Sequence, residues 1–117
     1  MNLIIVEDDK VLSLLLSKMI ERLGYEVLAI STKGKDATQK IKELQPDLVL
    51  MDIMLEDEID GIEVMTSVRS DALDIPVIYI TGNSDSVNYE RAQKTGFIDY
   101  LIKPVSFQDL KQSIGKV

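Results

Sequence analysis

The stretch Leu48-Val49-Leu50-Met51-Asp52 decides the fold, because it is a short, unbroken apolar run that ends in a carboxylate. Runs of this kind, rich in Ile, Val and Leu and without polar alternation, are typical of parallel strands that are buried on both faces. Working outward, the chain holds five of them, at residues 3–6, 27–30, 48–51, 77–80 and 100–102. We therefore predict five parallel strands.

The segments between the predicted strands carry apolar residues at helical spacing. Gly24 and Gly96 follow two of these segments as terminators, and Ser106 opens the last one with Asp109 three residues later, which is a capping pattern. Because parallel strands need right-handed crossovers, the helices must cover both faces of one sheet. The prediction is a single doubly wound α/β domain over residues 1–117. Its helices are expected around the apolar stripes at residues 12–23, 37–44 and 62–68 and at residues 86–95 and 106–114.

Composition limits the chemistry that this chain can perform. Its 117 residues fit one domain, and a hydrophobic content of 45% excludes wholesale disorder. The sequence contains no cysteine and no histidine. These absences exclude disulfides, thiolate or imidazole metal sites, thiol nucleophiles and a Ser-His-Asp triad. Any reaction must therefore use carboxylates, hydroxyls, amines and backbone groups.

The charge balance argues against nucleic acids and membranes as partners. The chain has 20 acidic and 13 basic residues, a net charge of −7, and no dense run of Lys and Arg. Nucleic-acid phosphates and anionic lipids repel such a surface. The sequence also lacks the ~20 consecutive apolar residues of a membrane span and the basic start of a signal peptide. We expect a cytoplasmic protein without direct nucleic-acid or membrane binding.

Charged and hydroxyl side chains follow the predicted strands. In doubly wound sheets, ligands bind outside the carboxyl ends of the strands. We interpret Asp9 as a helix cap, and residues 31 and 32 as the start of the second helix. The remaining side chains at the strand ends are the candidate site: Glu7 and Asp8 after the first strand, Asp52 after the third, Thr81 after the fourth and Lys103 after the fifth.

Glu7, Asp8 and Asp52 are predicted to converge on one rim of the sheet. Carboxylates a few Å apart repel by ~4 kcal/mol per pair at intermediate dielectric, so either their pKa values rise or a cation compensates. Oxygen ligands without histidine or cysteine favour a hard ion, and Mg²⁺ is the usual one. Such a site leaves Asp52 an oxygen that is suited to attack phosphorus and form an acyl phosphate. Lys103 and Thr81 could then bind the phosphoryl oxygens.

An acidic pair, an aspartate, a threonine and a Lys-Pro pair follow strands one, three, four and five in that order. In this respect the whole chain, from residue 3 to the last helix, resembles a response regulator receiver domain, the CheY-like family of two-component signalling. The resemblance implies a flavodoxin-like sheet with the strand order 2-1-3-4-5. It implies that Asp8 binds Mg²⁺ directly and Glu7 through water, while the backbone carbonyl of Met54 is the third protein ligand. Asp52 matches the phosphoacceptor.

The resemblance also implies a reaction and a switch. Asp52 accepts a phosphoryl group from a phosphohistidine on a sensor histidine kinase or phosphotransfer protein, because this chain has no histidine of its own. Thr81 and Lys103 bind the phosphoryl oxygens, and the Lys103–Pro104 peptide bond is often cis in the family. Tyr100 matches an aromatic switch residue. The surface of the fourth helix, fifth strand and fifth helix then changes shape and binds a downstream effector, so the domain is a phosphorelay switch and not a turnover enzyme.

Three features depart from the family pattern. The acidic loop at residues 55–61 is one residue longer than usual, Val105 replaces a frequent Phe, and Ile98 stands where DNA-binding members that dimerise carry an acid. By analogy with the family, Met54 and Asn83 flank the approach of the hydrolytic water. No output domain follows the last residue, which predicts either a stand-alone receiver or a piece of a longer regulator or hybrid kinase.

Three alternatives use a similar fold or nucleophile. A phosphohydrolase of the haloacid dehalogenase type needs a second aspartate two residues after Asp52, where this chain has Met54. A flavodoxin-like nucleotide binder would be repelled by the acids after the first strand. An interaction module of the same fold that works without phosphorylation would be expected to have lost Asp52 or Lys103, and both are present. This interaction module is the main alternative function.

Overall fold

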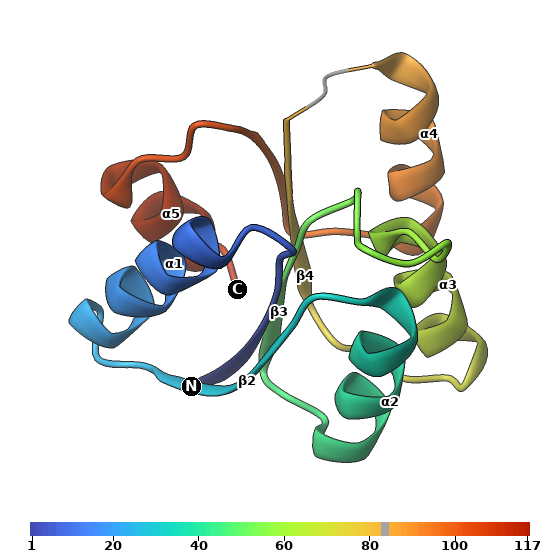
Figure 1. Ribbon diagram of the computed structural model, residues 1–117, viewed down its shortest axis with the longest axis horizontal. Coiled ribbons are helices and arrows are strands. Elements are labelled where there is room, and N and C mark those ends of the chain that lie inside the picture. The colour runs from blue at the N-terminus through green and yellow to red at the C-terminus, as the bar shows by residue number, and fades with distance from the viewer. Residues whose placement is uncertain (83–84) are drawn as a thin grey trace.

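The computed structural model describes residues 1–82 and 85–117, along which strands and helices alternate (Figure 1). All five predicted strands and all five predicted helices are present, with boundaries that shift by a few residues. The elements are β1 (Asn2–Val6), α1 (Lys10–Arg22), β2 (Glu26–Ser31), α2 (Gly34–Leu44), β3 (Leu48–Met51), α3 (Gly61–Ser70), β4 (Val77–Thr81), α4 (Ser86–Thr95), β5 (Asp99–Ile102) and α5 (Phe107–Ile114). Within the described ranges, none of these helices has the length and apolar character that crossing a membrane requires.

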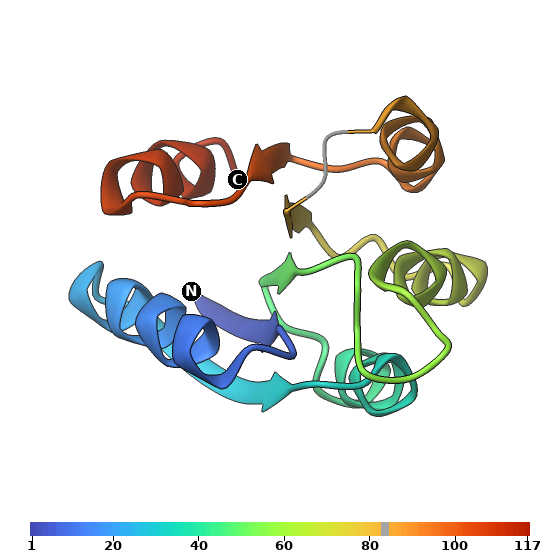
Figure 2. The same cartoon turned by 45° about the horizontal axis from the view of Figure 1, so that its top comes forward.

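The five strands form one parallel sheet in the order β2-β1-β3-β4-β5, which is the order that the family resemblance implies. Helices α1 and α5 cover one face, and α2, α3 and α4 cover the other (Figure 2). Side chains alternate between these two layers along β1. Leu3 and Ile5 pack with α1 and α5, whereas Ile4 and Val6 pack with the opposite helices. The hydrophobic core therefore lies on both sides of the sheet, and polar side chains are left for its rims.

Burial differs between the central strands and the edges of the sheet. Every residue of β3 and β4 is buried, as expected of strands covered on both faces. The outer strands are only partly buried, and Ile30 in β2 and Ile102 in β5 are 40% and 43% exposed. The prediction of burial on both faces is therefore wrong for these two strands, because each has a neighbouring strand on one side only.

Several helix boundaries agree with the sequence patterns. Asp9 caps α1, as predicted, and Ser106 opens α5 with a capping box. Gly24 and Gly96 follow α1 and α4 with φ angles of 87° and 69°, a backbone region in which glycine avoids the strain of a side chain. Asp60 opens α3 with a second capping box, eight residues beyond Asp52. Asp52 is therefore not the cap of the following helix.

The start of α2 differs from the prediction. Residues 31 and 32 do not begin a helix, because Ser31 still pairs with Val6 in the sheet and α2 begins at Gly34. The Ser31 hydroxyl donates to Asp36 at 2.6 Å, and this contact lowers the pKa of that carboxyl. Lys33, the N-cap residue of α2, contributes no side-chain hydrogen bond. The first backbone N–H groups of α2 therefore need a partner from elsewhere in the chain.

Candidate functional site

Three carboxylates meet at the carboxyl ends of β1 and β3. These strands are adjacent and parallel, so the residues that follow them come to the same rim. Glu7, Asp8 and Asp52 each offer an oxygen, and these oxygens all lie within 4.8 Å of one another. Glu7 and Asp52 are only 1% and 5% exposed, whereas Asp8 is half-buried. The expected convergence of the three acids is confirmed by the geometry.

Lys103 reaches this acidic cluster from the end of β5. Its Nζ donates to Asp52 Oδ2 at 3.0 Å and lies 2.8 Å from Glu7 Oε1. The latter contact lacks hydrogen-bond geometry, so it is an ion pair. The backbone N–H of Lys103 donates to the carbonyl of Thr81 at 2.8 Å, which ties the end of β5 to the end of β4. The Lys103–Pro104 peptide bond is cis, as the family resemblance implies.

The cluster is electrostatically unbalanced. Burial raises the pKa of Glu7, and the neighbouring Asp52 carboxylate raises it further. Burial and Glu7 likewise raise the pKa of Asp8. Burial alone would lower the pKa of Lys103, but its contacts with Glu7 and Asp52 outweigh that effect and raise it. One ammonium thus faces three carboxylates, and the oxygen-only donor set fits a hard divalent cation.

Thr81 and Tyr100 lie beyond the acidic cluster on β4 and β5. Thr81 is the last residue of β4 and is 1% exposed. Tyr100 is half-buried, and its hydroxyl is buried without a hydrogen-bond partner among the described residues. The Tyr100 ring makes an edge contact with Tyr89 of α4, with a centroid distance of 5.0 Å, and also contacts Phe97. The predicted switch residue is therefore linked directly to α4. Asn83, predicted to flank the hydrolytic water, lies outside the described residues.

The loop between β3 and α3 carries Met54. Met54 is 65% exposed, and the family resemblance assigns its backbone carbonyl, not its side chain, to the metal site. The Gly61 N–H donates to the carbonyl of Ile53 at 2.8 Å and closes the loop at its base. A Cβ on Gly61 would lie 2.1 Å from the Asp52 carbonyl, so the close approach requires glycine. The loop therefore leaves and rejoins the fold directly beside Asp52.

Sequence reasoning missed one residue of this loop. Asp57 accepts hydrogen bonds from the first N–H groups of α2, which is more than twenty residues away along the chain. No signal in the sequence points to this contact, because residues 31 and 32 look like the start of α2, and only the structure shows Lys33 as an N-cap without a side-chain hydrogen bond. Glu56 and Glu58 are equally plausible candidates from sequence, and only the folded loop distinguishes them from Asp57.

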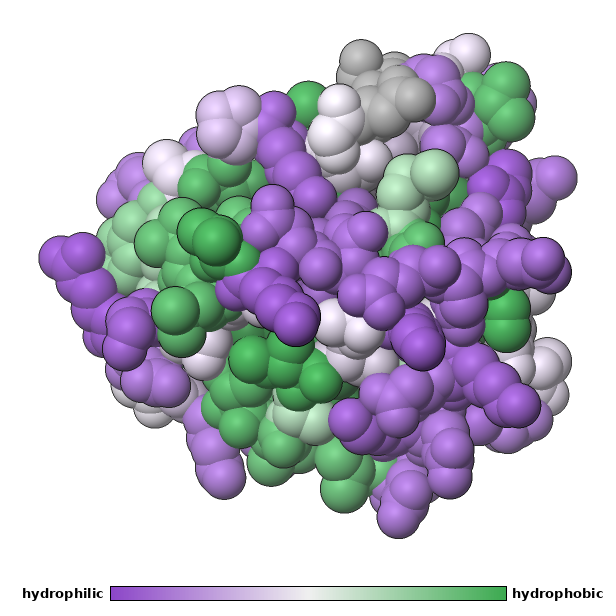
Figure 3. Space-filling view, viewed as in Figure 1, coloured by the Kyte–Doolittle hydropathy of each residue, from purple (hydrophilic) through white to green (hydrophobic). Residues whose placement is uncertain are grey.

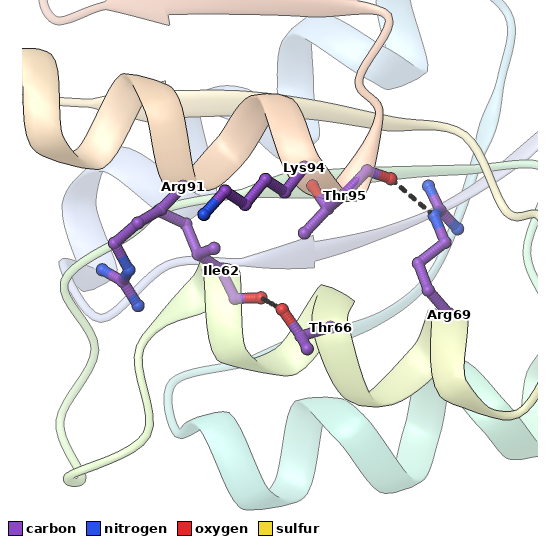
Figure 4. Close-up of a pocket in the computed structure, with 6 residues that line it drawn as sticks. All are labelled: Ile62, Thr66, Arg69, Arg91, Lys94 and Thr95. Carbon is purple, nitrogen blue, oxygen red and sulfur yellow. Dashed lines mark hydrogen bonds between the residues drawn. The ribbon is translucent and has the colours of Figure 1, made fainter.

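A second cluster of charge lies away from this rim, between α3 and α4. It surrounds a pocket of about 270 Å³ (Figure 4). Arg69 extends from α3 and donates to the carbonyl of Thr95 at 2.8 Å, while Arg91 pairs with Asp60 at 2.9 Å. These basic groups hold α4 against α3, and no carboxylate of the acidic cluster lines the pocket. The lining residues are Ile62, Thr66, Arg69, Arg91, Lys94 and Thr95.

An apolar surface borders the acidic cluster on its other side. Hydrophobic residues gather over α1, whereas the face over α2 and α3 is largely hydrophilic (Figure 3). Val11 and Leu15 of α1 are 79% and 48% exposed. They line a groove of about 400 Å³ together with Lys103 and the following Pro104. The groove is therefore lined mainly by apolar side chains, with Asp9 and Lys103 as its charged residues.

Comparison with known proteins agrees with this arrangement. Residues 3–115 match the sequence family described as response regulator receiver domain. The chain is 33% identical over 115 residues to the transcriptional regulatory protein ZraR of Escherichia coli. It is 30% identical over 116 residues to the alkaline phosphatase synthesis transcriptional regulatory protein PhoP of Bacillus subtilis. These matches cover 98% and 99% of this chain but 26% and 48% of the relatives, so the chain spans about a quarter to a half of their length.

Solved structures share the same fold. A DNA-binding response regulator of the LuxR family from Staphylococcus aureus is 32% identical, with a TM-score of 0.91 over 98% of this chain and 96% of that chain. The signal receiver domain of a modulated diguanylate cyclase from Desulfovibrio desulfuricans is 34% identical, with a TM-score of 0.88 over 97% and 90% of the two chains. The likeness extends over nearly the whole chain, including the strand ends that carry the acidic cluster.

Proposed function

Because this chain belongs to the family of response regulator receiver domains, we propose that residues 1–117 act as a phosphoacceptor switch in a two-component phosphorelay. Receiver domains are signalling domains rather than classical enzymes. In this proposal, Asp52 takes a phosphoryl group from a phosphohistidine on a sensor histidine kinase or phosphotransfer protein. The observation that carries the proposal is the buried Asp52 carboxylate, which lies between two further acids and the Lys103 ammonium.

The transfer follows from the chemistry of this cluster. A carboxylate oxygen of Asp52 forms a bond to phosphorus while the bond between phosphorus and the donor imidazole breaks, so the product is an acyl phosphate and a free histidine. Such transfers have a loose transition state, and catalysis is mainly alignment and charge neutralisation. The Lys103 ammonium already donates to Asp52 at 3.0 Å and is placed to donate to a phosphoryl oxygen instead. The hydroxyl of Thr81, at the end of β4, would donate to a second phosphoryl oxygen.

The acidic cluster supplies the donors that a metal cofactor needs. Glu7, Asp8 and Asp52, together with the backbone carbonyl of Met54, would hold Mg²⁺, which would neutralise charge on the transferring group. The raised pKa values of Glu7 and Asp8 support this assignment, because they reflect a site that is short of positive charge. Before transfer, the contact between Asp52 and the Lys103 ammonium at 3.0 Å would orient the nucleophile.

The output of the switch is a change in the surface formed by α4, β5 and α5. A new phosphoryl group would draw the Thr81 hydroxyl toward it, and Tyr100 would turn into the space that becomes available. The Tyr100 hydroxyl has no partner among the described residues, so its rotation breaks no described hydrogen bond. A nearly complete shift between two states takes roughly 5 kcal/mol, which a few charge-assisted hydrogen bonds can supply.

The partners of the whole protein are part of the same proposal. The two curated relatives are transcriptional regulators that are longer than this chain, which supports a downstream effector or output region reached through the α4-β5-α5 surface. Direct contact of this domain with nucleic acid is not expected, because its net charge is −7. We place the protein in the cytoplasm, where such kinases present their phosphohistidine.

The proposal is tested by intact-mass measurement after incubation with acetyl phosphate and Mg²⁺. We expect the mass of one phosphoryl group to be gained by the wild type, and not by Asp52→Ala or in the presence of EDTA. Asp74→Ala, which changes an exposed aspartate outside the acidic cluster, should gain it normally. An adduct that persists in Asp52→Ala would place the acceptor elsewhere. No adduct from acetyl phosphate or from a panel of histidine kinases would favour the phosphorylation-independent interaction module.

A further inference from the structure

We propose that Asp57 is a positioning residue for the metal site. Its carboxylate fastens the loop of residues 54–60 to the N-terminus of α2, and it thereby places the backbone carbonyl of Met54 beside the acidic cluster. The inference rests on the proposed function, since it assigns the carbonyl of Met54 to the Mg²⁺ site. It concerns the acidic loop at residues 55–61, in which four of the seven residues are acidic.

The contact between Asp57 and α2 is bidentate. Oδ1 accepts the N–H of Gly34 at 2.7 Å, and Oδ2 accepts the N–H of Lys35 at 3.0 Å. These bonds lower the pKa of Asp57, with the Lys35 N–H as the largest cause. Because Lys33 offers no side-chain cap, Asp57 supplies the negative group that the positive end of this helix favours. The two hydrogen bonds therefore fasten the loop to α2 and also stabilise the N-terminus of this helix.

The surrounding backbone is built for this contact. A Cβ on Gly34 would lie 2.4 Å from the carbonyl oxygen of Ile59, so only glycine allows the loop to come this close. The N–H of Glu56 donates to the carbonyl of Thr32 at 3.2 Å, one residue before Asp57. The loop thus rests on the start of α2 and the residues before it through one backbone hydrogen bond, a close backbone approach and the two hydrogen bonds of Asp57.

The position of Met54 follows from these anchors. The hydrogen bond between Gly61 and Ile53 fixes the loop immediately before Met54, and the contacts of Glu56 and Asp57 fix it two and three residues after. A backbone carbonyl between two such anchors has little freedom to rotate. Asp57 is not one of the three acids whose oxygens lie within 4.8 Å of one another, so it acts on the site through the loop and not as a ligand.

The test measures Mg²⁺ binding to the full chain by isothermal titration, with Mg²⁺ alone as the probe. We expect Asp57→Ala to weaken the affinity about 10-fold, as is typical when the groups that orient metal ligands are removed. Asp57→Asn keeps an acceptor oxygen for the α2 N–H groups and should recover most of the affinity. Glu58→Ala removes the same charge from an exposed neighbour without a described contact, and we expect it to match the wild type.

Two further measurements separate a positioning role from a purely structural one. Gly34→Ala should disrupt the same junction from the side of α2 and weaken Mg²⁺ binding to a similar degree. Hydrogen exchange without metal should show the N–H groups of Gly34 and Lys35 losing protection in Asp57→Ala. Lost protection with unchanged Mg²⁺ affinity would overturn the proposal, since Asp57 would then only cap α2. An equal loss of Mg²⁺ affinity in Glu58→Ala would overturn it as well, because the removal of one negative charge from the loop would then explain the effect.

Phosphorylation of the wild-type chain and its binding of Mg²⁺ distinguish failure of the positioning role from failure of the proposed function. If the wild type gains a phosphoryl group but Asp57→Ala binds Mg²⁺ normally, only the positioning role fails. If the wild type neither binds Mg²⁺ nor gains a phosphoryl group, the proposed function fails, and the positioning role fails with it.

Discussion

Two acidic stretches of this chain have opposite electrostatic environments. Glu7 and Asp8 follow β1 and face another carboxylate, and burial raises the pKa values of both. Asp57 lies in the equally acidic loop before α3 but faces backbone N–H groups, which lower its pKa. The local sequences, Glu-Asp-Asp and Glu-Asp-Glu, are nearly the same. The neighbours in space therefore decide whether a carboxylate is crowded by like charge or acts as a stabilising cap.

The acidic cluster and Asp57 have opposite effects on the stability of the fold. The acidic cluster costs folding free energy in the absence of a cation, because like charges are held together in a poorly solvated place. The loop acid contributes folding free energy, because it satisfies donors that would otherwise lack a partner. Substitutions of acids in the two regions should therefore change stability in opposite directions, while the removal of Lys103 should expose the cost of the cluster most strongly.

The largest effect is expected for Lys103→Met. This change leaves the buried carboxylates of Glu7 and Asp52 without their ammonium, and we expect the free energy of unfolding in metal-free buffer to fall by about 2–3 kcal/mol. Urea denaturation in EDTA measures this fall in the free energy of unfolding, and added Mg²⁺ should restore part of the lost stability. Lys116→Met is the matched control, because that ammonium pairs with Asp99 at 2.8 Å but is 57% exposed. Equal losses in the two variants would contradict the special cost of the cluster.

A smaller loss is expected for Asp57→Ala. Removing a helix cap lowers the free energy of unfolding by about 1 kcal/mol, here at neutral pH. Because the pKa of Asp57 is lower in the folded state than its ordinary value of 3.8, this contribution is present above pH 3.8 and disappears as the pH falls through the folded value. Urea denaturation as a function of pH should show the two proteins converging in acid. A difference in the free energy of unfolding that does not change with pH would show that the charge of Asp57 does not stabilise α2.

An effect of similar size but opposite sign is expected for Glu7→Gln. The pKa of Glu7 is raised above its ordinary value of 4.5, so ionisation favours the unfolded state as the pH rises from 4.5 through the folded value. Gln removes this penalty, and we expect the metal-free variant to be more stable than the wild type by about 1 kcal/mol at pH 7 but not below pH 4.5.

The matched control for this prediction is Glu90→Gln, which changes an exposed glutamate of α4. It should leave the free energy of unfolding within about 0.5 kcal/mol of the wild-type value. A Glu7→Gln variant that is less stable than the wild type at pH 7 would show that the ion pair with Lys103 outweighs the repulsion, and would remove the contrast between the two acidic stretches.

Much of the site could be predicted because it depends on topology. Once five apolar runs are recognised as parallel strands, the residues after them must share one rim, and this brings Glu7, Asp52 and Lys103 together. Burial at the sheet edges could not be predicted from the runs themselves, because Ile30 and Ile102 look like core residues until their strands are placed at the edges. The strand order, which puts β2 and β5 at the edges, was implied by the family resemblance and could not be derived from periodicity.

The sequence by itself determined the alternation of strands and helices, the rim of the sheet at which the candidate site lies, and the residue types available there. Periodicity and strand ends are local properties, so they can be read along the chain. Only the tertiary structure decided that Asp57 caps a helix 23 residues before it, while Asp8 joins a crowded cluster. A carboxylate acquires its role from the donors, charges and solvent around it, and those come from distant segments that meet only in the folded protein.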